Sequence, residues 1–247
     1  MEKTEKKPEF DVTVVIPVCN EGDVIEGVLN DWIKAIALSN LKVLILIEDA
    51  NSTDGTRDVL LTFASDYDFI RVSFRPDRDG FKNALIRMFQ EVRSPWIFVA
   101  DSDGQYLASD FQYFLDSINQ WNSYDVPWFI KGVKINRRDN FFRRFSSFIM
   151  NRFIVVLIGL PFLDYNSSHY LIRKELLDIM LEEGFKFKQS INVEVTMRAL
   201  LSNKKHQILY VKHLPRVQGV SRGNPPLKFI RYGVSTIRDV WNLKSNF

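Results

Sequence analysis

The chain has 247 residues, 46% of them hydrophobic, and its 33 Lys and Arg residues nearly balance its 30 Asp and Glu residues. This composition is typical of a globular protein long enough to bury a full core, and one domain is the expectation. Cys19 is the only cysteine, which excludes an intrachain disulfide and a zinc site built on cysteines. The apolar run 153–163 is too short to span a bilayer, so any membrane contact is expected to be peripheral.

Basic residues are concentrated in two segments of the second half. Residues 131–152 hold seven Lys and Arg residues against one acid, and residues 204–231 hold seven and no acid. A surface of this kind suits phosphates, nucleic acid or anionic lipid. The polar residues 1–10 lack the apolar core of a secretion signal and are expected to form a disordered tail.

Strand and helix patterns alternate from residue 12 onward. In the first half, strands are predicted at 12–17, 41–47, 70–74 and 96–100, and helices at 20–37, after the turn 49–56 as far as 64, and at 81–92. In the second half, strands are predicted at 128–133, 171–173 and 207–211, and helices at 110–121, 143–160, 174–183 and 193–202. This order predicts an α/β fold with a mostly parallel central sheet flanked by helices, whose loops collect on one edge. No linker divides residues 11–224, so they are expected to form one domain.

An amphipathic helix is expected in the last segment, 225–247. Ile230, Val234, Ile237 and Trp241 fall on one helical stripe, with basic residues beside it. Such a stripe either packs on the sheet or lies in a membrane interface, and the basic flanks favour the interface.

The strand at 96–100 ends at two carboxylates spaced i, i+2 and followed by an amide. Side chains at i and i+2 of an extended segment point to the same side. Asp101, Asp103 and Gln105 could therefore offer oxygen ligands to one divalent cation and hold a metal-bound phosphate at the end of a buried strand. The alternative is that Asp-Ser-Asp-Gly is only a turn that closes the strand.

Four segments together resemble glycosyltransferase family 2, which has the GT-A fold. They are Ile-Pro-Val-Cys-Asn-Glu at 16–21, Glu-Asp-Ala-Asn-Ser-Thr-Asp-Gly-Thr at 48–56, the segment around Gly80, and Asp-Ser-Asp-Gly-Gln at 101–105. Within the family, the chain is most similar to polyprenol-phosphate glycosyltransferases of the dolichol-phosphate-mannose synthase type. That likeness extends the match to about residues 11–230 through Arg143-Arg144, the Ser-x-x-x-Asn pattern at 147–151, Asp164, and Arg-x-x-Gly-x-Ser at 216–221.

The resemblance implies a nucleoside site at the end of the first strand. It assigns Pro17, Cys19 and Glu21 to nucleoside binding, while Asn20 is an alternative cap for the following helix. Gly80, with Arg78 and Lys82 beside it, is similar to the loop that approaches the diphosphate. The late basic residues that fold over the diphosphate in the family correspond to Arg216 and Arg222.

The second strand departs from the family pattern. The family usually has two adjacent acids before the Ser-x-Asp-Gly turn, whereas the second acid position here falls on Ala50, unless an inserted residue makes Glu48 and Asp49 the pair. Asp49 is the expected contact to the base or ribose, and Asp54 is expected to cap the next helix through Thr56. By the same resemblance Asp101, Asp103 and Gln105 form the metal and diphosphate site, and the metal is expected to be Mg²⁺ or Mn²⁺.

On the acceptor side, the resemblance implies a lipid phosphate bound by basic residues. The second pKa of such a phosphate is about 6, so at neutral pH it is largely dianionic and needs no general base. Of the arginines at 137, 138, 143 and 144, the family positions favour Arg143 or Arg144, together with Ser147, while the others would meet lipid headgroups. Glu194 lies where some family members have a functional acid. The three histidines share no metal-ligand spacing.

The expected function is inverting transfer of a hexose from a nucleotide sugar, of the GDP-mannose or UDP-glucose type, to a polyprenyl or dolichyl phosphate. The protein would act on the cytoplasmic face of a membrane as a peripheral protein, with no nucleic-acid partner, and a membrane-protein partner is left open. Three alternatives remain: a family 2 transferase with a saccharide hydroxyl acceptor and a carboxylate base, a nucleotidyltransferase, and a non-catalytic binding module if Ala50 marks decay of the nucleoside site. The nucleotidyltransferase alternative lacks the expected leading Gly-rich, Lys-containing signature.

Overall fold

A computed structural model of the chain describes residues 8–119, 125–135, 141–160, 164–188, 190–215 and 226–244, with side chains described outside 141–144, 146, 226–232 and 244. The strands are β1 (Val12–Val18), β2 (Val43–Ala50), β3 (Ile70–Arg75), β4 (Trp96–Val99), β5 (Phe129–Ile135), β6 (Tyr170–Arg173) and β7 (His206–Lys212). The helices are α1 (Ile25–Ala37), α2 (Thr56–Asp66), α3 (Phe81–Glu91), the 3-10 helix η1 (Ala108–Asp110), α4 (Phe111–Asn119), α5 (Phe141–Ile158), α6 (Lys174–Glu183), α7 (Ile191–Leu201) and α8 (Pro226–Lys244).

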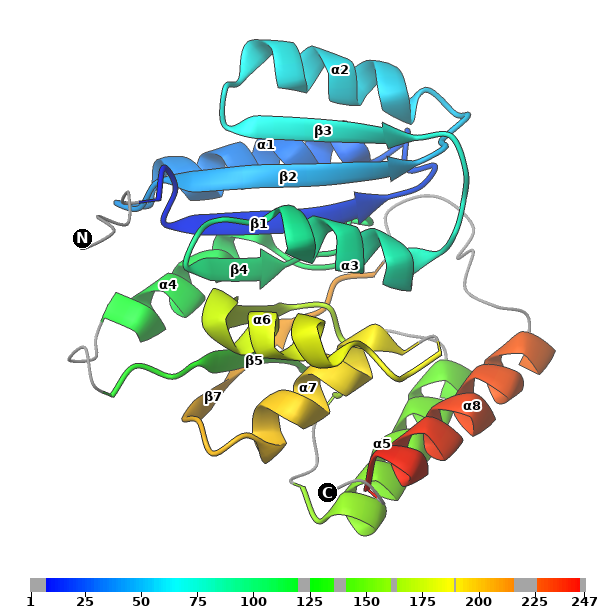
Figure 1. The fold of residues 1–247 in the computed structure, drawn as a ribbon. Coiled ribbons are helices and arrows are strands. Elements are labelled where there is room, and N and C mark those ends of the chain that lie inside the picture. Colours follow the sequence, from blue (N-terminus) through cyan, green and yellow to red (C-terminus); the bar gives the residue numbers. More distant parts are fainter. Residues whose placement is uncertain are drawn as a thin grey trace.

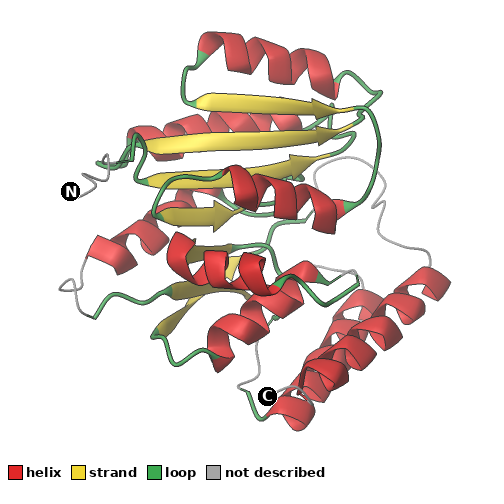
Figure 2. Cartoon of the chain, in the orientation of Figure 1, coloured by secondary structure: helices red, strands yellow, loops and turns green. Residues whose placement is uncertain are grey.

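Within the described ranges, seven strands form one sheet in the order β3-β2-β1-β4-β6-β5-β7. β6 is antiparallel to both of its neighbours, and the other pairs are parallel. The arrowheads of β1 to β4 therefore point to the same side of the molecule (Figure 1), and helices cover both faces of the sheet (Figure 2). The predicted mostly parallel α/β sheet is confirmed.

The central strands are apolar on both faces because helices pack on both. Along β4, Phe98 belongs to a core on the side of α1 and α4, whereas Ile97 and Val99 belong to a second core on the side of α3, α6 and α7. β1 alternates in the same way, with Val14 and Val15 in different cores. A run of apolar residues without polar alternation is typical of such doubly covered strands.

A third core lies where α5 and α8 pack against α7, and Val133 of β5 and Ile208 of β7 border it. It contains Met150 and Ile154 of α5, Val240 and Leu243 of α8, and residues of α7 such as Met197. The two long helices lie side by side at the edge of the molecule toward which the strand arrowheads point (Figure 1). None of the helices in the described ranges is long and apolar enough to cross a membrane.

The start of α1 differs from the prediction. The helix begins at Ile25 with Val24 as its N-cap, so Asn20 does not cap it. Asn20 instead has a left-handed φ of 55° and joins two loops: its backbone N–H donates to the Ser52 hydroxyl (2.7 Å), and its side-chain oxygen accepts from the Thr53 N–H (2.8 Å). The five-residue difference arises because the loop contact satisfies Asn20 outside the helix.

Gly132 in β5 is a position where the fold leaves no room for a side chain. A Cβ there would lie 2.8 Å from the carbonyl oxygen of His169. Gly132→Ala is expected to lower the free energy of unfolding by roughly 1–3 kcal/mol, because overpacking forces the backbone apart. Gly27→Ala in α1 is the matched control, since a Cβ there meets nothing within 4 Å and a helical alanine stabilises by roughly 0.5–1 kcal/mol. Thermal unfolding of both variants measures this, and equal melting temperatures would contradict it.

Candidate active site

A cleft of about 620 Å³ lies at the carboxyl ends of β1, β2 and β4. It brings together residues that are distant in the sequence, because parallel strands release their loops at the same edge. The lining residues predicted from the sequence are Pro17, Cys19, Glu21, Arg78, Gly80, Asp101, Asp103 and Gln105. Cleft-lining residues are spaced two apart at these strand ends: Pro17 and Cys19 at the end of β1, and Asp101 and Asp103 after β4.

The two aspartates after β4 lie at the floor of this cleft. Asp103 accepts a hydrogen bond from the backbone N–H of Gln105 (3.1 Å), so the turn itself orients its carboxylate. Burial, and then the nearby Asp103 carboxylate, raise the pKa of Asp101 to about 6, against the opposing effect of a hydrogen bond from Ser168. The Gln105 side chain donates to the carbonyl of Leu214 (3.3 Å), which leaves its amide oxygen as the acceptor atom.

This donor set fits a hard divalent cation. Two crowded carboxylates and an amide oxygen are the ligand types that Mg²⁺ and Mn²⁺ prefer, and a cation between the aspartates would offset their repulsion. No group of three or more His, Cys, Asp or Glu side chains in the described residues could hold a metal by itself. A cation at Asp101, Asp103 and Gln105 would therefore depend on further oxygens from a ligand or water.

The loops after β1 and β2 are fixed to each other by polar contacts. The backbone N–H of Glu21 donates to the Thr56 hydroxyl (2.9 Å), and that of Gly22 donates to Asp54 (3.3 Å). Asp54 also accepts from the backbone N–H of Thr56 (3.3 Å), but the N-cap of α2 is Gly55, so Asp54 lies one residue before the cap position that was predicted for it. These contacts hold the cleft wall formed by Pro17 and Cys19 in place.

At the end of β2, Glu48 and Ala50 line the cleft, whereas Asp49 lies on the other side of the strand. Asp49, the predicted base or ribose contact, is fully buried, and it accepts hydrogen bonds from Arg57 (2.7 Å) and from the backbone N–H of Ser52 (3.1 Å). The Asp49 side chain points away from the cleft, because alternate side chains of a strand point to opposite faces. Of the two acids of β2, Glu48 is the one that lines the cleft, and its carboxylate accepts a hydrogen bond from the Arg87 guanidinium (3.0 Å).

The segment before α3 brings backbone and one cation to the cleft. Gly80 has a φ of 94°, which other residues adopt only with strain, and it immediately precedes the helix. Arg78 lines the cleft and donates to the carbonyl of Asn51 (2.9 Å). Lys82, predicted to approach the diphosphate, instead donates to the carbonyl of Phe187 (2.6 Å) and joins α3 to the loop before α7.

A second wall faces the aspartates and was not predicted from the sequence. It consists of Lys134 from β5, the loop residues Asn166, Ser167 and Ser168, and Asn192 from α7. Lys134 lies 3.9 Å from Asp164, and the Asn192 amide donates to the Ser168 hydroxyl (3.1 Å). These residues follow no local motif, since they meet only through the order of strands in the sheet.

Several arginines predicted to bind the acceptor phosphate or the nucleotide diphosphate cannot be compared with the cleft. Arg137, Arg138, Arg216 and Arg222 lie outside the described residues, and the helix α5 includes Arg143 and Arg144 without their side chains being described. Ser147 is half-buried in α5 and is not among the residues that line the cleft. These assignments remain predictions.

Glu194 holds the backbone of the loop before α7. Its carboxylate is fully buried and accepts the backbone N–H groups of Lys186 (2.8 Å) and Phe187 (2.7 Å), with Arg198 3.6 Å away. The interpretation of Glu194 as a functional acid is therefore not supported, because these donors already occupy its oxygens.

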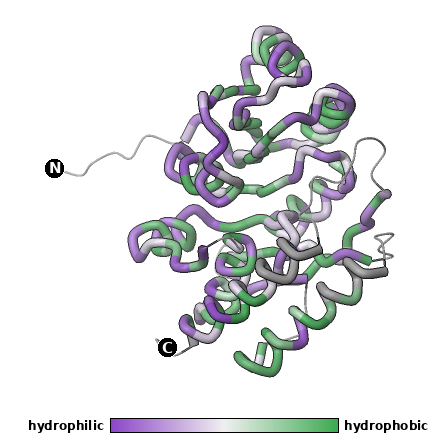
Figure 3. The backbone as a smooth tube through the Cα atoms, turned by 90° about the vertical axis from the view of Figure 1, so that its right-hand side faces the viewer, coloured by the Kyte–Doolittle hydropathy of each residue, from purple (hydrophilic) through white to green (hydrophobic). Residues whose placement is uncertain are grey.

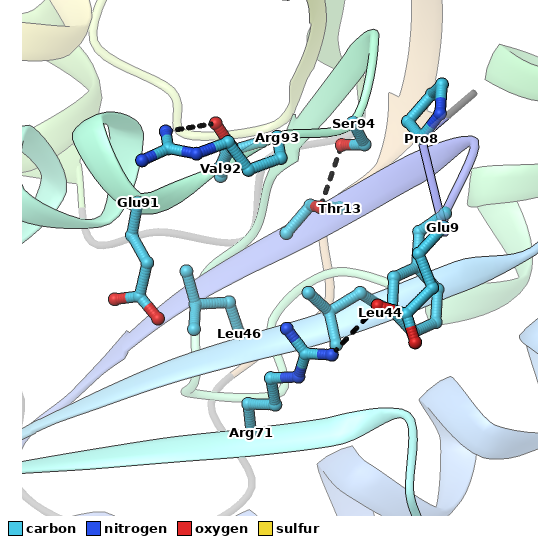
Figure 4. Close-up of a pocket in the computed structure, with 11 residues that line it drawn as sticks. Pro8, Glu9, Thr13, Leu44, Leu46, Arg71, Glu91, Val92, Arg93 and Ser94 are labelled. Atoms are coloured by element: carbon cyan, nitrogen blue, oxygen red, sulfur yellow. Dashed lines mark hydrogen bonds and ion pairs between the residues drawn. The ribbon is translucent and has the colours of Figure 1, made fainter. Parts of the chain in front are cut away.

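A smaller cavity of about 110 Å³ lies near the amino ends of β1 and β2 (Figure 4). Four of its polar side chains form two pairs: Ser94 donates to the Thr13 hydroxyl (2.8 Å), and Arg71 donates to Glu9 (3.3 Å). The cavity contains none of the predicted site residues, and its paired groups indicate a structural role.

Comparison with known proteins places this geometry in a family. Residues 13–179 match the family model of Glycosyl transferase family 2. An undecaprenyl-phosphate 4-deoxy-4-formamido-L-arabinose transferase from Klebsiella pneumoniae (strain 342) is 30% identical over 177 residues, which cover 70% of this chain and 52% of that protein. A protein of the same name from Yersinia pestis (strain Pestoides F) is 26% identical over 176 residues, which cover 71% of this chain and 52% of that protein. The chain thus spans about half the length of the curated relatives it matches.

Solved structures show the same fold at low identity. Glucosyl-3-phosphoglycerate synthase from Mycobacterium tuberculosis, in complex with Mn²⁺, uridine diphosphate and phosphoglyceric acid, has a TM-score of 0.67 and 16% identity, with 94% of this chain and 79% of that chain covered. Mannosyl-3-phosphoglycerate synthase from Rubrobacter xylanophilus has a TM-score of 0.63 and 17% identity, with coverage of 96% and 74%. The resemblance and the fold class expected from the sequence are confirmed.

The two acids of β2 are expected to respond differently to substitution. Asp49→Asn should lower the free energy of unfolding by roughly 1.5–3 kcal/mol, because Arg57 and the Ser52 N–H lose a charged acceptor, and should leave nucleotide affinity nearly unchanged. Glu48→Gln should weaken nucleoside diphosphate binding, because Glu48 lines the cleft. Thermal unfolding with and without a panel of nucleoside diphosphates and Mn²⁺ measures both effects. A larger loss of nucleotide affinity in Asp49→Asn than in Glu48→Gln would contradict this assignment.

Proposed function

Because the chain belongs to glycosyl transferase family 2, we propose that it is an inverting transferase that moves a hexose from a nucleotide sugar to a polyprenyl phosphate. The donor would be of the GDP-mannose or UDP-glucose type. The curated relatives are named as transferases that act on undecaprenyl phosphate, which supports a lipid phosphate acceptor. The shared segment is about half of their length, so the acceptor class of this chain is itself part of the proposal.

The observation that carries the proposal is the cleft with two chemically different walls. Pro17, Cys19 and Glu48 form a wall at the ends of β1 and β2 where a nucleoside would lie. Asp101 and Asp103 form the floor beside it, and the start of α3 at Gly80 presents backbone N–H groups, which suit a diphosphate.

The cation would be held by Asp101, Asp103 and Gln105. When bound, it would stabilise the negative charge that develops on the leaving nucleoside diphosphate. The residues of the protein would position the donor so that its anomeric carbon faces the second wall. Arg78 at the cleft edge would add a cationic contact to the diphosphate.

The second wall suits an anionic acceptor. Lys134 supplies a cation, and Ser168 and Asn192 supply polar groups, while the acid behind them, Glu194, is fully buried and already engaged. A phosphate dianion needs positive charge and hydrogen-bond donors but no base. In the alternative with a saccharide hydroxyl acceptor, a carboxylate would have to be the base.

A polyprenyl phosphate lies in a membrane, so the enzyme would work at the membrane surface as a peripheral protein on the cytoplasmic face. The acceptor's phosphate would enter the cleft from the side of α5, where the sequence places Arg143, Arg144 and Ser147. A membrane-protein partner is not required by this arrangement.

One experiment distinguishes the candidate functions. The protein is incubated with radiolabelled nucleotide sugars and extracted lipids, and the label is followed into lipid and water phases. Label in the lipid phase that is released by mild acid supports the proposal. Label in a water-soluble saccharide would favour the hydroxyl-acceptor alternative, and nucleotide binding without turnover would favour a binding module. Release of pyrophosphate in a parallel incubation with a nucleoside triphosphate and a sugar phosphate would favour a nucleotidyltransferase.

Asp103→Ala is expected to abolish sugar transfer and the Mn²⁺-dependent stabilisation by nucleoside diphosphate. The protein should remain folded, because Asp103 lies in the cleft and contributes little packing. Asp58→Ala, at an exposed position of α2, is the control and should keep both properties. Transfer assays and thermal shifts with and without EDTA measure this. Undiminished wild-type activity in EDTA would rule out the metal site as described.

Substitution of the acceptor-side cations should affect the two substrates unequally. Lys134→Ala, and separately Arg143→Ala with Arg144→Ala, should raise KM for polyprenyl phosphate far more than KM for the nucleotide sugar, because each charge-assisted phosphate contact contributes roughly 1.5–3 kcal/mol. Lys42→Ala, an exposed change remote from the cleft, serves as the control. Equal losses for both substrates in steady-state kinetics would count against an acceptor role.

A further inference from the structure

Helix α5 is apolar on two opposite faces. Its inner face contributes Met150 and Ile154 to the third core. Its outer face exposes five large apolar side chains at the spacing of one helical stripe: Phe145 (53% exposed), Phe148 (53%), Ile149 (40%), Phe153 (46%) and Val156 (74%). A group of exposed apolar side chains of this size on a protein surface normally marks an interaction site, and the described part of the chain does not cover it.

Helix α8 lies beside α5 and has the same division. Thr236, Val240 and Leu243 are buried toward the third core, whereas Val234 (57%) and Trp241 (61%) are exposed. The outer faces of both helices therefore point away from the same core. Figure 3 views the molecule from the side on which this pair lies and shows hydrophobic stretches along helices in its lower part.

The charges on these two helices are of one sign. The sequence of α5 contains three arginines and no acid, and Arg152 is exposed between Phe148 and Phe153 on the outer face. The sequence of α8 contains four basic residues and one acid, Asp239, which is buried and accepts the backbone N–H of Lys188 (3.0 Å). The outer surface thus combines exposed aromatic and aliphatic side chains with positive charge and shows no acid among its described residues.

We propose that the outer face of α5, extended by Val234 and Trp241 of α8, docks on the surface of an anionic lipid bilayer. A helix with aromatic and aliphatic side chains beside basic ones lies in the plane of the membrane interface, with its apolar side among the acyl chains and its cations at the headgroups. The 18 residues of α5 correspond to a length of about 27 Å along that plane. The positive charge without exposed acids among the described residues complements the negative charge of an anionic lipid surface.

The purpose of docking rests on the proposed function, since docking would bring the cleft to a lipid acceptor. The test of docking does not depend on that function. Vesicles of phosphatidylcholine alone and of phosphatidylcholine mixed equally with phosphatidylglycerol, both free of polyprenyl phosphate, are floated with the full chain in the absence of nucleotide sugar. Wild type should float with the anionic vesicles, less at high salt and less with the neutral ones. Transfer to a short-chain prenyl phosphate in solution is measured separately, so failure of the docking surface and failure of the enzyme are distinguishable.

Phe153→Ser combined with Val156→Ser should lower the vesicle partition coefficient by at least about tenfold, because two large apolar side chains leave the interface. Leu61→Ser combined with Ile179→Ser, exposed by 55% and 47% on α2 and α6, is the matched control and should bind as wild type. Arg152→Gln should weaken anionic binding by about fivefold. Val156→Trp should strengthen binding to both vesicle types, and it tests the same face without removing an apolar side chain.

Vesicle binding by Phe153→Ser with Val156→Ser that equals wild type would overturn the proposal. It would also be overturned if wild type bound neither vesicle type. In that case, light scattering that shows a dimer of wild type and a monomer of the variant would assign the face to a second copy of this chain. A monomer in both would assign it to another protein segment.

Discussion

The shared direction of β1, β2 and β4, each buried on both faces, is the constraint on which the site depends. The register of the strands staggers their ends: β1 continues to Val18 beside Asp49, whereas β4 stops at Val99 beside Val15. The chain therefore leaves β4 at Val99, three residues below the end of β1, and Asp101 follows two residues later. This stagger makes the aspartates a floor and the ends of β1 and β2 a wall, which is the shape that a nucleoside attached to a metal-bound diphosphate requires.

The reversal of β6 supplies the opposite wall. Because β6 runs antiparallel between β4 and β5, the loop that precedes it arrives at the edge where β4 ends, and it brings Ser168 to Asp101. Buried Lys131, one strand away, donates to the carbonyl of Ser167 and holds this loop. Burial lowers the pKa of Lys131 to about 7, an effect that nearby acids oppose. A wholly parallel sheet would send this loop to the other edge, and the cleft would lose its second wall.

The strand-end residues could be predicted because their signal is local. An apolar run that stops at Asp101 and Asp103 identifies both the strand and the face that the carboxylates share, and Pro17 and Cys19 follow the same rule. Local reasoning could not decide whether Glu48 or Asp49 faces the cleft, because adjacent residues of a strand point to opposite faces. The strand β2 also runs to Ala50, whereas the prediction ended it at residue 47.

Other residues were beyond local reasoning because their partners are distant in the chain. Lys82 contacts the carbonyl of Phe187, 105 residues away, and Lys134 reaches the cleft only through the order β4-β6-β5. Glu194 follows an ordinary helical pattern, and nothing in that pattern shows that two backbone N–H groups meet its carboxylate. Periodicity identifies elements and their apolar faces, whereas the sheet order decides which polar side chains meet.

Helix α8 shows a further limit of periodicity. The strongest apolar stripe in its sequence includes Val234 and Trp241, yet these residues are exposed, and the packed face consists of Thr236, Val240 and Leu243 with Asp239 beside them. Burial of the weaker stripe is possible because its polar members are satisfied: Thr236 is within 2.5 Å of the Ser190 hydroxyl, and Asp239 accepts from Lys188. Polar groups bonded in this way cost little when buried, so the core does not need the more apolar face. Val234 and Trp241 of the predicted stripe are thus left exposed, because hydrogen bonds allow the more polar face of the helix to be buried.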